Sequence, residues 1–245
     1  MTLDAARLCL ALGLFTASGS LAQIDMGGDF PVMDWLTPVI DSQRFGALLR
    51  SNLGLDDHGN TQAATNKSAV PATLRYVPGP ALKKATVDGY VSRLKTKNPA
   101  ASQALAANFG PGKYDYATIY SGVVKGNGLN DNDAVDVMTA YMVLGYMIVN
   151  NMQNGNAVTP AMVGKVRAQF APGLAGNVKL SVPGVAAQLG EELKLQTVIV
   201  QGGWQSAIKE GTLSAYQQGI GALFKSQWGL DFAALKLTNQ GFSSK

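Results

Sequence analysis

The feature that most limits the fold is an apolar run preceded by acidic residues, "DNDAVDVMTAYMVLGYMIVNN" at 131–151. The thirteen residues from Val137 to Val149 contain almost nothing polar. A helix that spans a bilayer needs about 20 apolar residues, so this run is too short to cross one without a large mismatch. A helix that is apolar on every side is typical of the centre of a helical protein. We therefore expect a buried central helix, with the short polar residues 131–133 as its cap and first turn.

The same acidic stretch could instead be a calcium-binding loop. Such a loop has oxygen ligands at its first, third and fifth positions, glycine at the sixth and glutamate at the twelfth. Counted from Asp131, the fifth, sixth and twelfth positions hold Val135, Asp136 and Met142. Three of the five positions therefore fail, and helix capping is the interpretation that fits. No metal ion or other cofactor is predicted.

Helical periodicity recurs between Leu74 and Gly229. A capping residue followed by proline, as in Asn98–Pro99 and Thr159–Pro160, is typical of a helix N-terminus. A long helix is expected between 182 and 211, although the glycines at 202–203 could kink it and "LQTVIV" alone could form a strand. No segment alternates convincingly with a period of two, and no repeat emerges. The pattern predicts an all-α, bundle-like domain of about six to seven helices at 74–245.

The first 22 residues have the organisation of a cleaved signal peptide. Arg7 precedes the apolar stretch "LCLALGLF", and Ser20 and Ala22 are the small residues expected before a cut at Gln23. We predict export to the periplasm or the exterior, and no transmembrane segment in the mature chain.

Residues 23–73 are predicted to form an acidic arm, with an amphipathic helix at 38–53 and a flexible, polar linker at 54–73. Residues 23–60 have a net charge of −4, whereas 61–245 have +8. The arm could dock in a partner's groove, lie on the envelope surface or fold back onto the basic body. The candidate interaction surface combines its apolar residues with two cations of the body: Trp35, Leu36, Ile40, Phe45, Leu48, Leu49, Leu53, Lys83 and Lys84.

The sequence lacks the residues that most catalytic sites need. Cys9, the only cysteine, lies in the signal peptide, and His58, the only histidine, lies in the linker. These positions exclude a site with two histidine ligands and any thiol chemistry in the mature chain. No G-x-S-x-G motif or paired carboxylates stand out, and Glu191 and Glu192 are expected on a solvated helix flank. The basic residues at 83–97 are interpreted as a solvated helix end, and nucleic-acid binding is not predicted.

Three stretches, "LRYVPGPALKKATVDGYVSRLKTKNPAASQALAANF", "GLNDNDAVDVMTAYMVLGYMIVNN" and "GLDFAALKLTNQGF", carry a resemblance to a known family. Over residues 74–242 the chain is similar to small exported bacterial proteins catalogued only as a domain of unknown function. Family members often place tryptophan in the central helix, where this chain has Tyr146. The resemblance implies export and a helical body, and it implies no activity.

These observations favour an exported helical binding or assembly accessory protein that acts through its surfaces on an unknown protein partner, without a cofactor. A binding role is favoured over catalysis. One alternative is a hydrolase or lyase that uses isolated Asp, Tyr and Lys groups in a helical cleft; its mark would be convergent titratable groups with perturbed pKa values. Another is a peripheral envelope-surface binder.

Overall fold

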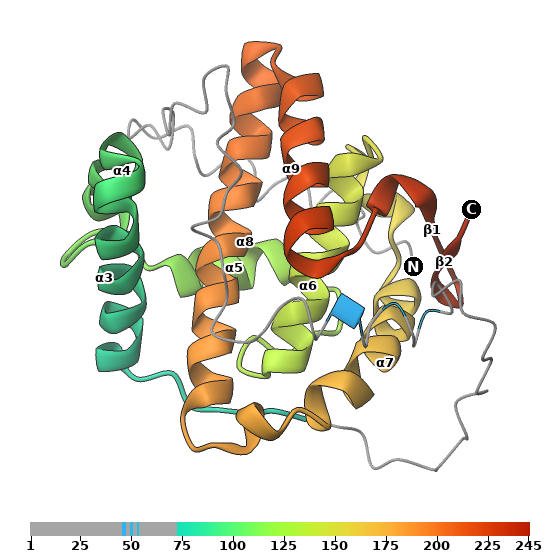
Figure 1. Cartoon of the computed structure of the whole chain (residues 1–245), viewed down its shortest axis with the longest axis horizontal. Helices are drawn as coiled ribbons and strands as arrows, with labels where there is room; N and C mark the ends of the chain where they lie inside the picture. The colour runs from blue at the N-terminus through green and yellow to red at the C-terminus, as the bar shows by residue number, and fades with distance from the viewer. Residues whose placement is uncertain (1–45, 48–49, 51–52, 54–72) are drawn as a thin grey trace, which may run out of the picture.

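The computed structural model describes residues 46–47, 50, 53 and 73–245. Within this part of the chain the structure is almost entirely helical, which confirms the all-α, bundle-like prediction (Figure 1). The elements, in chain order, are α3 (Pro80–Lys97), α4 (Pro99–Phe109), α5 (Tyr116–Val124), α6 (Ala134–Val149), η3 (Gly155–Ala157), α7 (Pro160–Ala175), η4 (Val178–Ser181), α8 (Val185–Glu210), α9 (Leu213–Trp228), η5 (Phe232–Ala234), β1 (Leu235–Thr238) and β2 (Gly241–Ser244).

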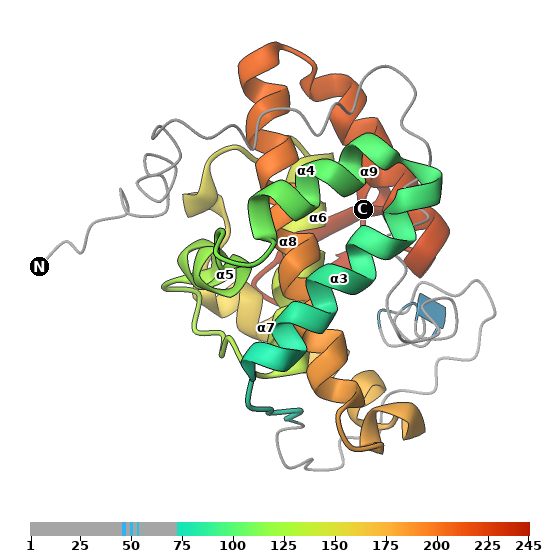
Figure 2. The same cartoon turned by 90° about the vertical axis from the view of Figure 1, so that its left-hand side faces the viewer.

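Helix α6 is the central helix that the apolar run predicts. It contacts α7, α8 and α9, and nearly all of its residues are buried. Helix α8 runs the height of the molecule beside it, with α3 and α4 on one side and α9 on another (Figures 1 and 2). None of the helices in the described residues is long and apolar enough to cross a membrane.

Four helices begin at a polar capping residue, as the sequence predicts for Asn98, Thr159 and the acidic stretch at 131–133. The side chains of Asn98, Asp115, Asp133 and Thr159 each accept a hydrogen bond from a backbone N–H two or three residues further along. Each cap satisfies one of the N–H groups that the first turn of a helix leaves without a partner. The acidic stretch thus starts α6 through Asp133, as helix capping requires.

The structure differs from the prediction at the closing hairpin and confirms the long helix expected between 182 and 211. The chain ends in a short antiparallel hairpin in which Leu237 faces Phe242, and its four-residue strands are too short to show an alternating pattern. Helix α8 continues unbroken through 202–203, and "LQTVIV" is helical. A Cβ atom at Gly203 would lie 2.7 Å from the Tyr216 hydroxyl, so this glycine allows α9 to pack closely against α8 instead of kinking it.

Candidate functional site

The most unusual feature of the interior is a charged pair on α8. Glu191 is 0% exposed and Lys194 is 1% exposed, and their side chains form an ion pair with a distance of 2.6 Å between Nζ and Oε1. Charged side chains are almost never fully buried unless they are paired. The expectation that Glu191 and Glu192 lie on a solvated flank was therefore wrong, because both carboxylates face inward.

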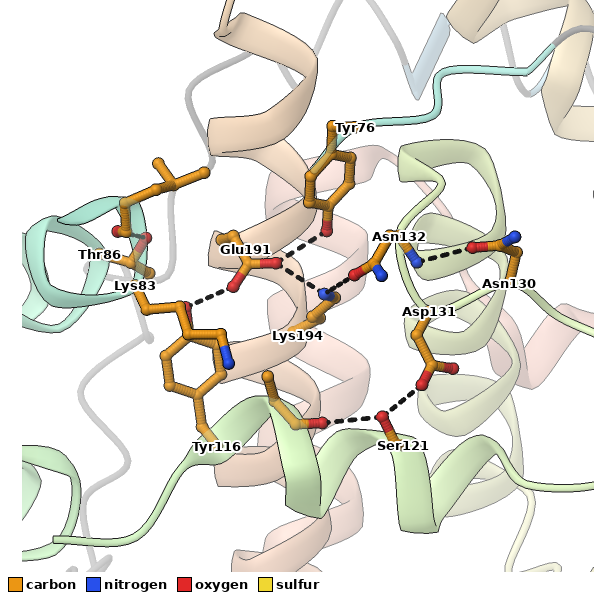
Figure 3. A network of polar contacts seen from close by, with 12 residues as sticks. Tyr76, Lys83, Thr86, Tyr116, Ser121, Asn130, Asp131, Asn132, Glu191 and Lys194 are labelled. Carbon is orange, nitrogen blue, oxygen red and sulfur yellow. Dashed lines mark hydrogen bonds and ion pairs between the residues drawn. The ribbon is translucent and has the colours of Figure 1, made fainter. Parts of the chain in front are cut away.

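Three further side chains complete the hydrogen bonds of this pair (Figure 3). The Tyr76 hydroxyl donates to Glu191 Oε1 at 3.0 Å, and the Tyr116 hydroxyl donates to Oε2 at 2.7 Å. Lys194 Nζ donates to Asn132 Oδ1 at 2.8 Å. We call these five residues the polar hub.

The hub joins segments that are far apart in the sequence. Tyr76 precedes α3, Tyr116 begins α5, Asn132 lies just before α6, and the ion pair comes from α8. Backbone contacts hold two of these segments together, since Tyr76 N–H donates to Asn132 O at 2.9 Å. Gly190 makes room for Tyr76, because a Cβ atom on Gly190 would lie 2.4 Å from the Tyr76 hydroxyl oxygen.

The acidic stretch at the start of α6 has two further ionic contacts. Arg167 of α7 pairs with Asp136 and lies 3.8 Å from Asp133. Asp136 also accepts the backbone N–H of Asn130 at 2.7 Å, and Asp131 accepts a hydrogen bond from Ser121. These carboxylates serve helix starts and packing, and no group of three or more His, Cys, Asp or Glu side chains in the described residues is arranged to hold a metal ion.

The electrostatics of the hub hold its tyrosines protonated. Burial, and then the Glu191 carboxylate, raise the pKa of Tyr76 and of Tyr116 far above its usual value. Burial, followed by the nearby carboxylates, also raises the pKa of Tyr120, whose hydroxyl has no hydrogen-bond partner in the described structure. The protonated hydroxyls of Tyr76 and Tyr116 therefore serve as hydrogen-bond donors to the Glu191 carboxylate.

A second polar contact on α8 lies directly beside the hub. Glu192 pairs with Arg93 of α3 at 3.5 Å, and the Arg93 guanidinium lies 4.2 Å from the centre of the Tyr90 ring. The Tyr90 hydroxyl in turn accepts a hydrogen bond from Gln196. This contact fixes α3 against α8, and burial raises the pKa of Tyr90.

The predicted interaction residues do not come together at the hub. Lys83 pairs with Asp115 at 2.8 Å, whereas Lys84, which is 64% exposed, pairs with Asp88 one turn along α3. Leu53 packs against the core and is partly buried. The remaining members of the predicted surface lie outside the described residues: Trp35, Leu36, Ile40, Phe45, Leu48 and Leu49.

No family model, curated protein or solved structure matches this chain. The resemblance over residues 74–242 to a family of exported proteins therefore remains a prediction.

Proposed function

We propose that this chain is an exported helical binding protein that acts through its surface as an assembly or accessory factor, without a cofactor. The observation that carries the proposal is a set of strongly exposed valines on short segments near the start of α8. Val77 is 90% exposed, Val178 is 81% exposed and Val182 is 52% exposed. Single exposed apolar residues are normal, but a group of them is typical of a protein interaction surface.

Local contacts bring these valines toward one end of the molecule. Val77 follows Tyr76, which packs against Gly190 near the start of α8. Val178 begins η4, an element that contacts α8, and Val182 accepts the backbone hydrogen bond of Val185. In both views the segment before α3 and the turn from η4 into α8 lie at the same end (Figures 1 and 2).

The rival hydrolase or lyase proposal receives less support. The hub does bring titratable groups together, and the pKa values of both of its tyrosines are strongly raised. However, the ion pair is buried and Glu191 already accepts hydrogen bonds from three side chains. A catalytic group must be able to reach a substrate atom, and this arrangement instead favours a structural role.

Site-specific photo-crosslinking in the host of origin tests the binding proposal. A photoreactive residue at Val77 or Val178 is expected to capture the same envelope or secreted protein. The matched control is Ile208, an exposed apolar residue near the other end of α8. At about 1.5 Å per residue it is roughly 35 Å from Val185 along the helix. Capture of the same protein from all three positions, or of none, would contradict the proposal.

A matched variant separates loss of binding from loss of folding. Val77→Ser removes exposed apolar surface without opening the core, so it is expected to leave the melting temperature unchanged and to abolish capture from position 178. Export is tested separately by N-terminal sequencing of the protein recovered outside the cytoplasm, where the predicted cut leaves Gln23 as the first residue.

A further inference from the structure

Part of the N-terminal arm lies on the C-terminal end of α9. Gly46, Ala47 and Arg50 are helical, and Leu53 lies in a turn whose N–H donates to Arg50 O at 3.2 Å. We call these four described residues the strap. We infer that the end of α9 is a docking surface for the strap of the same chain, and that the strap is therefore an intramolecular element of the fold.

The first contact is a close approach between two backbones. Gly46 is buried, and a Cβ atom at this position would lie 1.8 Å from the Trp228 carbonyl oxygen. Real Cβ atoms do not come so close to a backbone oxygen, so only glycine fits here without movement of one segment. An arm attracted to the body by net charge alone would need no such fit.

The second contact matches the charge at the end of α9. Arg50 Nη1 donates to the carbonyl oxygen of Gly229 at 3.4 Å, where the helix dipole is negative and the last carbonyls lack helical partners. Gly229 has a φ of +64°, as is common for a glycine that ends a helix. A Cβ atom on Gly229 would lie 1.7 Å from Arg50 Nη1, which is the movable end of a long side chain, so the positive φ is the stronger reason for glycine at this position.

The third contact of the strap is apolar. Leu53 is partly buried and packs against the hydrophobic core. The strap thus makes three kinds of contact with the body: a close backbone approach, a cation on a carbonyl oxygen and an apolar contact. Together these contacts define one specific position for the strap. Leu53 belongs to the apolar face of the predicted amphipathic helix, and its packing shows that this side chain faces the body of the same molecule.

Thiol labelling tests whether the strap is bound in solution. With Cys9→Ser the full chain contains no cysteine, so a single introduced thiol reports on one position. Leu53→Cys is expected to react roughly tenfold or more slowly than Ala47→Cys, whose position is exposed. Adding Gly46→Ala should raise the rate at position 53, whereas Gly164→Ala should not, because its Cβ atom would meet nothing within 4 Å. Equal rates at positions 47 and 53 in the otherwise unchanged chain would overturn the inference.

A second measurement keeps Leu53 intact. Gly46→Ala is expected to lower the melting temperature by several degrees, whereas Gly164→Ala, also in a helix, should leave it unchanged or raise it slightly. Equal melting temperatures for the two variants would also overturn the inference. Protection of position 53 that disappears on dilution would show that the strap of a second copy occupies the surface, and would contradict the intramolecular assignment.

Discussion

Removing the Lys194 ammonium group from the polar hub should lower the stability of the protein more than most single substitutions in this chain. Lys194→Met keeps the length of the side chain but leaves the Glu191 carboxylate, 0% exposed, with two tyrosine donors and no cation. It also removes the donor to Asn132 Oδ1. Breaking a buried pair by removing one partner costs about 3–5 kcal/mol. Because two hydroxyls still donate to the carboxylate, we expect a loss of about 3 kcal/mol in the free energy of unfolding.

The matched control is Lys84→Met, which removes the same group from an exposed pair with Asp88 on α3. An exposed pair one turn apart contributes about 0.5 kcal/mol or less. Urea unfolding followed by circular dichroism measures both variants, and the slope with urea should not change if both remain two-state. The melting temperature should fall by roughly 6–12 °C for Lys194→Met. A loss within about 0.5 kcal/mol of the control would refute the reasoning, because it would mean that Lys194 carries no buried charge interaction.

The double variant separates the charge from its hydrogen bonds. Glu191→Leu with Lys194→Met leaves no unpaired charge, although the hydroxyls of Tyr76 and Tyr116 lose their acceptor. We expect the double variant to lose about 1–2 kcal/mol less free energy of unfolding than the two single variants lose in sum. Additive losses would show that the two charges do not interact in the folded protein.

Three further predictions follow from packing and ionisation. Gly145→Ala in α6 places a Cβ atom 2.4 Å from the Phe224 ring and should cost roughly 1–3 kcal/mol, whereas Gly122→Ala in α5 meets nothing within 4 Å and should be neutral or stabilising; equal unfolding free energies would contradict this. The hydrogen bond from Lys225 lowers the pKa of Asp231. The contribution of the Asp231 carboxylate to folding stability is therefore present above the unfolded pKa of about 3.8 and is lost as the pH falls through the lower folded pKa. Asp231→Asn should reduce the free energy of unfolding slightly at pH 7 and should not change it in strong acid. Burial raises the pKa of six tyrosines: Tyr76, Tyr90, Tyr116, Tyr120, Tyr141 and Tyr216. The stability that they contribute is present below pH 10 and should be lost as the pH rises above it, so their tyrosinate absorbance should appear together with unfolding. Ionisation of these tyrosines while the helices remain intact would contradict this prediction.

The sequence was most informative where a single segment determines its own structure. The apolar run of α6 needs no partner to be recognised as a buried helix, and caps such as Asn98 and Thr159 act within their own first turn. The closing hairpin was missed because each strand has only four residues and two successive residues, Gly241 and Phe242, are both buried, which hides any alternation. Hydrophobic periodicity cannot identify such short strands.

The hub was missed for a different physical reason. Glu191, Glu192 and Lys194 lie close together in the sequence, as charged residues on the solvated side of a helix commonly do. They are buried by α3, α5 and the segments before α3 and α6, and these contacts span many residues of the chain. One signal was available, because the residues at 195–200 are mostly apolar without a polar face, as in α6. That pattern indicates a helix surrounded by others, in which neighbouring charges must find partners inside.

The hub also links the interior of the protein to the surface proposed for binding. Tyr76 bonds to Glu191 inside, and the next residue, Val77, is the most exposed of the apolar side chains in this group. A buried ionic group contributes little net stability compared with apolar packing, but it can select one arrangement among several. Tyr76→Phe should therefore reduce stability by only about 1 kcal/mol, while it frees the segment that positions Val77. Photo-crosslinking from position 77 should then weaken more than crosslinking from position 178, and an equal decrease at both positions would show that the hub does not position this surface.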